Sequence, residues 1–394
     1  MNTKTRILCS VGTRPEAIKM APVILALKRE PWAEVRILAT AQHRDLLDEI
    51  FRVFEIVPDV DLDIMQPDQT LVQLNSRLIP AIDRVLEAES PDIVLAQGDT
   101  TSVFLTALGC FYRKIPFGHV EAGLRTGERY YPFPEEMNRL LTTDLATFHF
   151  APTEISRANL LKEGVTPSSI FVTGNSVIDA MYDALERSHE LKPNITPGRR
   201  LILMTAHRRE NFGPAFRQVC EGARAIVDAV EDTELLYPVH PNPNVQKVAK
   251  DVMSGHPRIR LTEPISYVPF LGLMNAAELI LTDSGGIQEE APALGKPVLV
   301  FRNETERPEA VDLGVVKLVG PDRERIFEEG VKLLTDPAYY KSMAKGVSPY
   351  GDGKAAQRIV NIIKESRTDR GLVPNPAWDE VRKKTNPDSA GSTI

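Results

Sequence analysis

The residue types best suited to chemistry in this chain are a serine and two glycines that follow a short apolar run. Leu279–Thr282 is predicted to be a buried parallel strand, and the residues after it restart with helical spacing. Ser284, Gly285 and Gly286 then form a strand-to-helix turn, where unpaired N–H groups and the helix dipole favour a phosphate. Glu290, one helical turn on, could accept hydrogen bonds from a ribose diol. The alternative is an ordinary helix start with a serine cap and a solvated glutamate.

Two cations lie beside the turn after the first predicted strand, where Gly12 permits a tight turn. Arg14 and Lys19 are placed near a helix N-terminus, where the helix dipole disfavours positive charge. An anionic ligand explains this placement. A structural ion pair with Glu16 or Asp99 is the alternative.

Three carboxylates are expected on the same side of the sheet, two of them after strands and one at the start of a helix. Asp99 comes after a strand and could instead cap the next helix. Glu121 directly follows the buried strand Pro116–Val120, where solvation is poor, and Glu135 opens a helix, where acids are ordinary. Carboxylates gathered near cations have their pKa values pushed apart, so one site can hold both an acid and a base.

The second half of the chain adds a histidine and further cations after its strands. His207 follows the strand Leu201–Thr205 and could bind a phosphate or transfer a proton, although a lone histidine is more often structural. With Arg208 and Arg209 beside it, a phosphate role is at least as well supported as a structural one. Arg307 follows another predicted strand and contributes one more cation.

Composition limits the class of protein. A chain of 394 residues with 42% hydrophobic and 26% charged residues is expected to form two globular domains. A formal net charge of −7 argues against nucleic acid as a partner, and no apolar run is long enough to span a membrane. Cys9, Cys110 and Cys220 are expected to be buried thiols in a reducing, cytoplasmic compartment.

Several motifs are absent from the sequence. It has no Gly-x-x-x-x-Gly-Lys-Ser/Thr loop, and no Gly-x-Gly-x-x-Gly follows the first strand, which counts against ATP hydrolysis and a nicotinamide cofactor. No Cys, His or acidic cluster has the spacing of metal ligands. We therefore expect acid–base chemistry without a cofactor or metal.

Strand and helix patterns alternate along the chain, which predicts an α/β fold with two doubly wound, Rossmann-like domains. Strands are predicted at Arg6–Val11, Glu34–Ala39, Asp92–Ala96, Pro116–Val120, Leu201–Thr205, Leu235–Pro238, Ile259–Leu261, Leu279–Thr282, Pro297–Phe301 and Val315–Leu318. Because ligands bind beyond the carboxyl ends of such strands, the two domains are expected to face each other across a cleft. The predicted domains are 1–175, completed by a helix at 354–366, and 176–353, followed by a poorly ordered polar tail at 367–394.

Several sequence motifs together resemble the non-hydrolysing UDP-N-acetylglucosamine 2-epimerases. The resemblance extends in order from about Arg6 to Glu365. The matching motifs are Ser10–Pro22, Gly98–Thr101, His119–Thr126, Pro134–Arg139, Thr205–Asn211, Thr282–Pro292 and Thr305–Ala310.

This resemblance implies a fold of the glycosyltransferase-B type, a homodimer and a reaction without an added cofactor. The implied reaction inverts C2 of a UDP-sugar by eliminating UDP to 2-acetamidoglucal and adding it back, and it supplies cell-surface polysaccharide synthesis. Asp99, Glu121 and Glu135 would move protons, Lys19 would support them, and His207 would act on the leaving UDP. The implied substrate-binding residues are Arg14, Arg139, Phe270, Ser284, Gly285, Gly286, Glu290 and Arg307.

Some bacterial members of the resembled family bind a second substrate molecule as an activator. Gln42, Gln69, Arg208 and His240 match positions of that allosteric site. However, Asp45 and Asp68 stand where such members can carry Gln and Arg, and an acid beside a diphosphate weakens its binding.

Other functions fit parts of the pattern. A C2 epimerase of a diacetamido uronic acid type of UDP-sugar and a hydrolysing 2-epimerase share the expected fold. A glycosyltransferase would not need so many strand-end acids, and a catalytically silent nucleotide-sugar sensor would have lost them.

Overall fold

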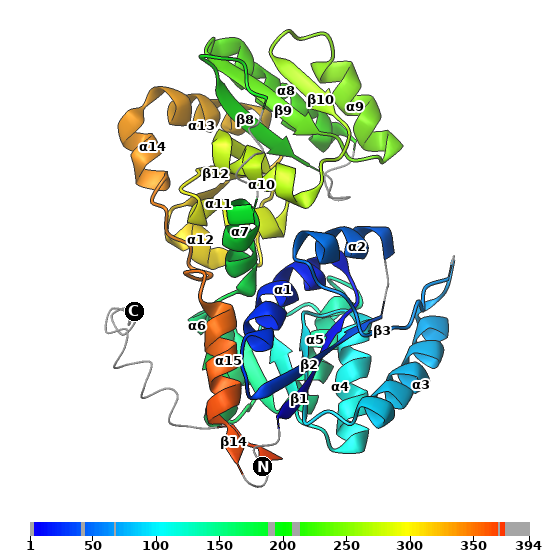
Figure 1. Ribbon diagram of the computed structural model, residues 1–394. Coiled ribbons are helices and arrows are strands. Elements are labelled where there is room, and N and C mark those ends of the chain that lie inside the picture. Colours follow the sequence, from blue (N-terminus) through cyan, green and yellow to red (C-terminus); the bar gives the residue numbers. More distant parts are fainter. Residues whose placement is uncertain are drawn as a thin grey trace. The chain divides into compact units, whose positions relative to one another are not determined.

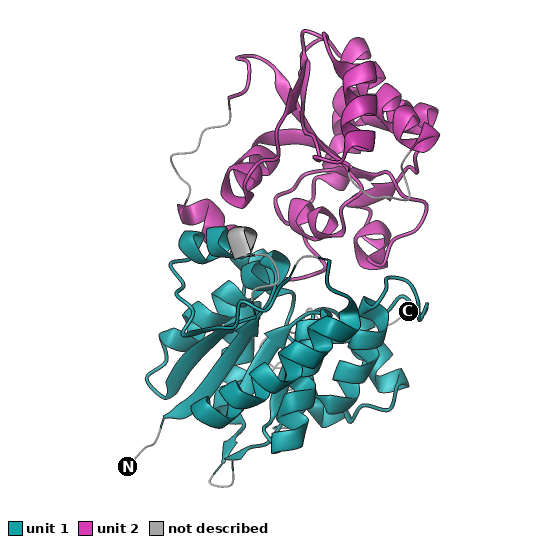
Figure 2. Cartoon of the chain, turned by 90° about the vertical axis from the view of Figure 1, so that its right-hand side faces the viewer, with its two compact units in different colours: residues 1–180, 353–394 teal, residues 181–352 magenta. Residues whose placement is uncertain are grey.

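The computed structural model describes residues 4–40, 44–66, 68–187, 194–206, 213–368 and 371–374. The chain divides into two compact units, residues 1–180 with 353–394 and residues 181–352 (Figure 2). The division falls within helix α7 (Ser176–Arg187), five residues beyond the predicted boundary at 175. Each unit contains its own parallel sheet.

The sheet of unit 1 has the order β3-β2-β1-β4-β5-β6-β7, and every pairing is parallel. Its strands are β1 (Thr5–Val11), β2 (Ala33–Ala39), β3 (Val60–Asp61), β4 (Ile93–Gln97), β5 (Phe117–Val120), β6 (Phe148–Ala151) and β7 (Ile170–Val172). The strand order reverses between β1 and β4. In doubly wound sheets ligands bind at this point, beyond the carboxyl ends of the strands.

Helices cover both faces of this sheet (Figure 1). They are α1 (Arg14–Lys28), α2 (Arg44–Val53), α3 (Leu71–Glu89), α4 (Thr101–Arg113), α5 (Glu135–Leu145), α6 (Glu154–Lys162) and α15 (Ala355–Glu365). α1 contacts α2 and α15, while α3, α4 and α5 pack in series. α1 begins at Arg14, because Thr13 and Glu16 form a capping box and Pro15 fits the first turn.

Unit 2 has a six-stranded parallel sheet in the order β10-β9-β8-β11-β12-β13. Its strands are β8 (Arg200–Thr205), β9 (Thr233–Pro238), β10 (Ile259–Thr262), β11 (Ala277–Thr282), β12 (Val298–Val300) and β13 (Val316–Leu318). Its helices are α8 (Pro214–Ala229), α9 (Pro243–Met253), α10 (Tyr267–Ala276), α11 (Gly285–Ala293), α12 (Pro308–Asp312), α13 (Arg323–Thr335) and α14 (Pro337–Met343).

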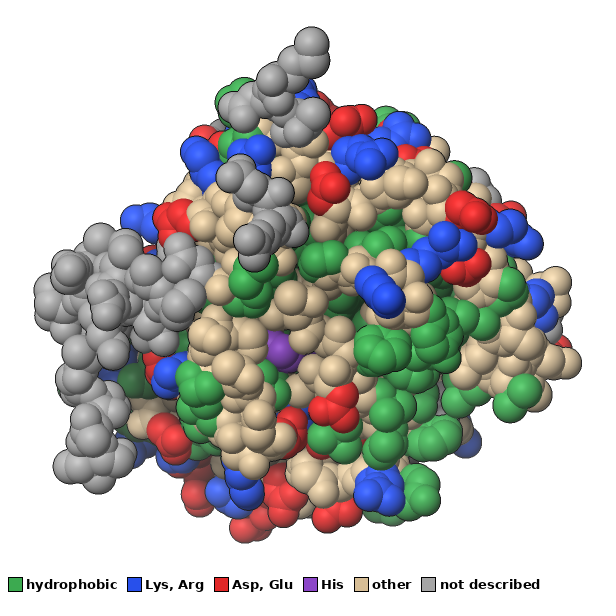
Figure 3. Space-filling view, turned by 90° about the horizontal axis from the view of Figure 1, so that it is seen from below, with side chains coloured by type: hydrophobic (Ala, Val, Ile, Leu, Met, Phe, Trp, Pro, Cys, Tyr) green, Lys and Arg blue, Asp and Glu red, His purple; other side chains and the backbone are tan. Residues whose placement is uncertain are grey.

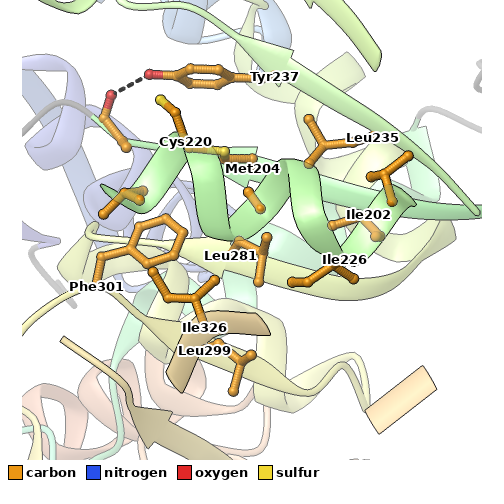
Figure 4. Packing of buried hydrophobic residues seen from close by; sticks show 14 of the residues in the cluster. Ile202, Met204, Cys220, Ile226, Leu235, Tyr237, Leu281, Leu299, Phe301 and Ile326 are labelled. Atoms are coloured by element: carbon orange, nitrogen blue, oxygen red, sulfur yellow. Dashed lines mark hydrogen bonds between the residues drawn. The ribbon is translucent and has the colours of Figure 1, made fainter. Parts of the chain in front are cut away.

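The core of unit 2 lies between its sheet and the helices α8 and α13, where apolar side chains from all three interlock (Figure 4). Ile226 of α8 and Ile326 of α13 are completely buried among the strand residues. Tyr237 is also completely buried, and its hydroxyl donates a 2.8 Å hydrogen bond to the carbonyl oxygen of Ala206. This core holds the carboxyl ends of β8 and β11 in adjacent register.

The predicted α/β fold class is confirmed, and the predicted strands match the observed ones to within two residues at each end. The predicted strand set did not include β3, β6 or β7, which have two, four and three residues. Within the segment predicted to be poorly ordered, β14 (Arg367–Thr368) and β15 (Gly371–Leu372) form a short antiparallel ribbon. All three cysteines are buried and free, as predicted. No helix in the described ranges is long and apolar enough to cross a membrane.

Candidate functional site

Glu121 is the most extensively hydrogen-bonded of the predicted catalytic acids. It is the first residue after β5, and its backbone adopts a left-handed conformation with φ of 68°, which is uncommon for a residue with a side chain. Its carboxylate forms an ion pair with Lys19 of α1. It also accepts hydrogen bonds from the side-chain amides of Gln97 at 3.0 Å and Asn175 at 2.7 Å. The structure therefore brings the predicted residues Glu121 and Lys19 into direct contact. Two residues that were not predicted orient the Glu121 carboxylate.

Gln97 and Asn175 were missed by the sequence analysis. Gln97 ends β4, and Asn175 immediately precedes α7. A polar residue at a strand end was the available signal for Gln97. For Asn175 the signal was weaker, because an asparagine before a helix usually caps it, and here its Oδ1 does accept a 3.1 Å hydrogen bond from the N–H of Val177.

Asp99 does not cap the helix that follows it, so that alternative is wrong. Thr100 caps α4 instead, accepting a hydrogen bond from the N–H of Val103. The Asp99 carboxylate is left to pair with Arg139, whose Nε and Nη2 donate to the same oxygen at 3.0 and 2.7 Å. Arg139 was predicted to contact substrate, and in this structure its guanidinium is engaged with the second predicted catalytic acid.

The two adjacent glutamates at the start of α5 have different environments. Glu135, the predicted catalytic residue, is half-buried and forms no side-chain hydrogen bond or ion pair with other described residues. Glu136, which the sequence analysis did not select, is buried and accepts hydrogen bonds from the N–H groups of Thr126 and Gly127 and from Arg139. Acids in a first helical turn are so common that sequence alone could not separate the two.

Glu16 is buried and does not pair with either predicted cation. Its Oε2 accepts hydrogen bonds from the backbone N–H groups of Gly12 at 2.5 Å and Thr13 at 3.3 Å. Burial raises its pKa to about 7, although hydrogen bonds from Thr100, Gly12 and Thr13 partly oppose that effect. Arg14, in the same turn, is exposed. The suggested ion pair between Glu16 and these cations is therefore wrong, since Lys19 pairs with Glu121.

His119 is buried in β5, next to Val120, and its ring is hydrogen-bonded to the turn after β4. Its Nε2 lies 2.7 Å from the carbonyl oxygen of Gly98, which adopts a positive φ of 95°. Burial lowers the pKa of His119 to about 3, so the ring is neutral and donates this hydrogen bond. The turn that carries Asp99 is thereby tied to the strand that carries Glu121.

In unit 2 the predicted phosphate-binding turn forms the N-terminus of α11. Ser284 is the N-cap residue, but its side chain makes no capping hydrogen bond, so the predicted alternative of a serine cap is wrong. The N–H groups of the first turn are left for another acceptor. A Cβ atom on Gly285 would lie 2.5 Å from Nη1 of Arg307, so the guanidinium packs directly on this turn.

Arg307 is held by two acids. Its Nε lies 2.5 Å from Glu289, and its Nη1 lies 2.7 Å from Glu306. Burial opposes ionisation of Glu306, but Arg307 and Arg302 lower its pKa to about 2. Arg307 is therefore fixed beside the N-terminus of α11 by Glu289 and Glu306, two acids that the sequence analysis did not select.

Glu290 lies on the same helix and is buried rather than solvated, against the predicted alternative. The hydroxyl of Tyr267 donates a 3.1 Å hydrogen bond to its Oε1. Burial, and then the neighbouring carboxylate, raises the pKa of Tyr267 well above its ordinary range. Phe270, predicted to lie near the base of the nucleotide, is half-buried on the same helix as Tyr267.

Several predicted residues lie outside the described residues or in different units. His207, Gln42 and Arg208 lie outside the described residues. Of the remaining proposed allosteric residues, Gln69 is half-buried in unit 1 and hydrogen-bonded to Arg77, while His240 is exposed in unit 2. Across the described ranges, no group of three His, Cys, Asp or Glu residues could hold a metal ion.

Comparisons with known proteins extend this description. Residues 25–364 match the family model described as UDP-N-acetylglucosamine 2-epimerase. The chain is 50% identical over 372 residues to the UDP-N-acetylglucosamine 2-epimerase of Escherichia coli K12, covering 92% of this chain and 99% of that protein.

Solved structures of similar proteins include two with bound ligands. The UDP-GlcNAc 2-epimerase from Neisseria meningitidis bound to UDP-GlcNAc is 46% identical, with a TM-score of 0.85, and the match covers 92% of this chain and 100% of that chain. The Methanocaldococcus jannaschii enzyme in complex with UDP-GlcNAc and UDP is 35% identical, with a TM-score of 0.76 and the same two coverages.

Proposed function

The chain belongs to the UDP-N-acetylglucosamine 2-epimerase family, and on this premise we propose that it interconverts UDP-N-acetylglucosamine and UDP-N-acetylmannosamine. The observation that carries the proposal is the environment of Glu121. Its carboxylate lies at a strand end, where it is ion-paired with Lys19 and oriented by two side-chain amides. A group that exchanges a proton with a ligand needs such a fixed position. UDP-GlcNAc is the molecule bound in the similar Neisseria enzyme.

The proposed chemistry is elimination followed by re-addition. A base takes the proton from C2, the electron pair of that C–H bond forms the C1=C2 double bond, and the C1–O bond breaks with its electrons leaving on UDP. The products are 2-acetamidoglucal and UDP. UDP then adds back to C1 while C2 receives a proton on the opposite face. Atoms and electrons balance without an oxidant or reductant.

Unit 1 would supply the groups that move protons. Removal and return of a proton on opposite faces of the sugar require an acid and a base, and Asp99, Glu121 and Glu135 are the candidates. Their differing environments support different roles, because Asp99 is paired with Arg139, Glu121 with Lys19, and Glu135 with no other described residue.

Unit 2 would bind the nucleotide. The uncapped N-terminus of α11 with Arg307 packed on Gly285 suits the diphosphate, and Glu290 suits a ribose diol. The same groups would stabilise the negative charge that develops on UDP as the C1–O bond breaks. His207 is proposed for this role from the family resemblance alone.

The test is to incubate the protein with UDP-N-acetylglucosamine in heavy water and follow C2 by NMR. We expect UDP-N-acetylmannosamine to appear and deuterium to be incorporated at C2 of both sugars. Free N-acetylmannosamine would instead identify a hydrolysing epimerase. If neither UDP-N-acetylmannosamine nor deuterium at C2 were detected, the proposal would be overturned. Turnover of a diacetamido uronic acid UDP-sugar alone would favour the related epimerase.

We further propose that the protein is a cytoplasmic homodimer. Its three buried free thiols fit a reducing compartment. Phe111 and Tyr112 on α4 and Leu141 on the adjacent α5 are exposed, and hydrophobic side chains gather on the side of the molecule shown in Figure 3. Sedimentation equilibrium is expected to give twice the chain mass of 43.8 kDa, and a monomer at micromolar concentration would contradict the proposal.

A further inference from the structure

We infer that Glu136 is a positioning residue that holds Asp99 in place through Arg139. The inference rests on the proposed function only in taking Asp99 as a group that acts on the sugar. The two neighbouring glutamates of the Pro134–Arg139 motif would then have different roles. Glu135 is available to the ligand, and Glu136 orients Asp99.

Glu136 connects the loop after β5 with Arg139, one turn further along α5. It is only 2% exposed, and its two oxygens accept hydrogen bonds from the N–H of Thr126 at 3.2 Å and the N–H of Gly127 at 3.1 Å. Its Oε2 also accepts a 2.7 Å hydrogen bond from Nη1 of Arg139. A buried carboxylate with this many donors has essentially one orientation, because any other would leave buried polar groups unpaired.

Arg139 transmits this orientation to Asp99. The guanidinium is planar, so fixing Nη1 on Glu136 also fixes the direction of Nε and Nη2, which donate to Asp99. Arg139 is 12% exposed, whereas Asp99 is 28% exposed and is accessible to a ligand. The amide of Asn138 donates a 2.9 Å hydrogen bond to the Asp99 carbonyl and holds the backbone from the same helix.

A second ion pair anchors the same segment without reaching Asp99. Arg125 donates from Nε and Nη2 to the two oxygens of Glu163, each at 2.7 Å, and Nη2 also contacts Thr143. This pair fixes the segment after β5 beside Thr126 and Gly127, just as Glu136 does. Glu163→Gln is therefore a matched control for a loss of anchoring alone.

The experiment compares Glu136→Gln with Glu163→Gln. Glutamine keeps the size of the side chain but removes one acceptor and the charge, so Arg139 loses its fixed direction in Glu136→Gln. We expect kcat for the epimerisation to fall about 10- to 100-fold with little change in KM, since a displacement of about 1 Å can cost about 100-fold in rate. Glu163→Gln should retain wild-type kcat.

An independent readout does not depend on activity. In protein labelled with ¹⁵N-arginine, the Nε–H signal of Arg139, assigned by its absence in Arg139→Lys, should shift or broaden in Glu136→Gln and stay unchanged in Glu163→Gln. An unchanged signal with unchanged kcat in Glu136→Gln would overturn the inference, as would equal loss of kcat in both variants. Inactive wild-type protein would overturn the proposed function, while the NMR comparison would still test the inference.

Discussion

At the scale of single residues, the site consists of acids that look alike in sequence and differ in their partners. Glu121 is paired with Lys19 and Asp99 with Arg139, whereas Glu16 is hydrogen-bonded by backbone N–H groups and the Thr100 side chain and has no cation partner among the described residues. Lys19 and Arg139 come from parts of the chain distant from the acids they contact. A carboxylate in a protein takes its properties from such neighbours, so residue type and position by themselves leave its role open.

Glu121→Gln tests the proposed proton transfer. The substitution keeps the shape of the side chain but removes its ability to take a proton, so kcat should fall by about 100-fold or more. UDP affinity, measured by titration calorimetry, should be unchanged, because the proposed nucleotide-binding groups lie in unit 2. If UDP binding collapsed together with turnover, Glu121 would have a structural role instead.

Glu16 predicts how stability depends on pH. Its pKa is about 7 in the folded protein and 4.5 in its ordinary state, so the folded protein binds the extra proton between these values. The contribution of Glu16 to the free energy of unfolding therefore falls by up to about 3 kcal/mol as pH rises from about 4.5 to 7, and it is constant above that range.

The measurement is the difference in unfolding free energy between wild type and Glu16→Gln, from urea denaturation at pH 5 and pH 8. The unfolding free energy of Glu16→Gln minus that of wild type should be about 2 to 3 kcal/mol higher at pH 8 than at pH 5. The comparison cancels other titrating groups. A difference independent of pH would show that Glu16 is ionised in the folded protein throughout.

At the scale of elements, the N-terminus of α11 depends on the absence of one side chain. Gly285→Ala would place a methyl group 2.5 Å from Nη1 of Arg307, and the guanidinium cannot move without leaving Glu289 and Glu306. We expect a loss of about 1 to 3 kcal/mol in unfolding free energy and weaker UDP binding.

Gly286→Ala is the matched control for stability. Its new Cβ would have a nearest neighbour at 4.0 Å, so the substitution brings only the helix propensity of alanine, a gain of up to about 1 kcal/mol. Thermal melting of both variants checks the pair. Equal melting temperatures would show that Arg307 is free to move away from Gly285.

At the scale of the whole molecule, the final helix completes unit 1. The carboxylate of Asp179 on α7 accepts hydrogen bonds from the N–H groups of Ala355 at 3.2 Å and Ala356 at 2.9 Å, at the start of α15. Arg358 donates to the carbonyl of Thr173, and α15 contacts α1. Unit 1 is therefore built from both ends of the chain.

Deleting residues 353–394 should unfold unit 1. The buried residues of α15 include Ile359, Val360, Ile362 and Ile363, whose burial contributes about 6 to 12 kcal/mol at most. That is comparable to the net stability of a whole domain, about 5 to 15 kcal/mol. Calorimetry should show the loss of one cooperative transition. A chain ending at residue 374 keeps all of α15 and is the control; equal melting of both chains would contradict the prediction.

The sequence by itself determined the alternation of strands and helices, and with it the fold class, because apolar period and turn residues are local properties. It also placed Glu121, Asp99 and Gly285 at strand ends, since polar residues there are visible in the order of residues. Only the tertiary structure decided which neighbour each of them has. Gln97 and Asn175 contact Glu121, and Arg139 contacts Asp99, from elsewhere in the chain. Such contacts depend on how strands and helices pack, which no local pattern specifies.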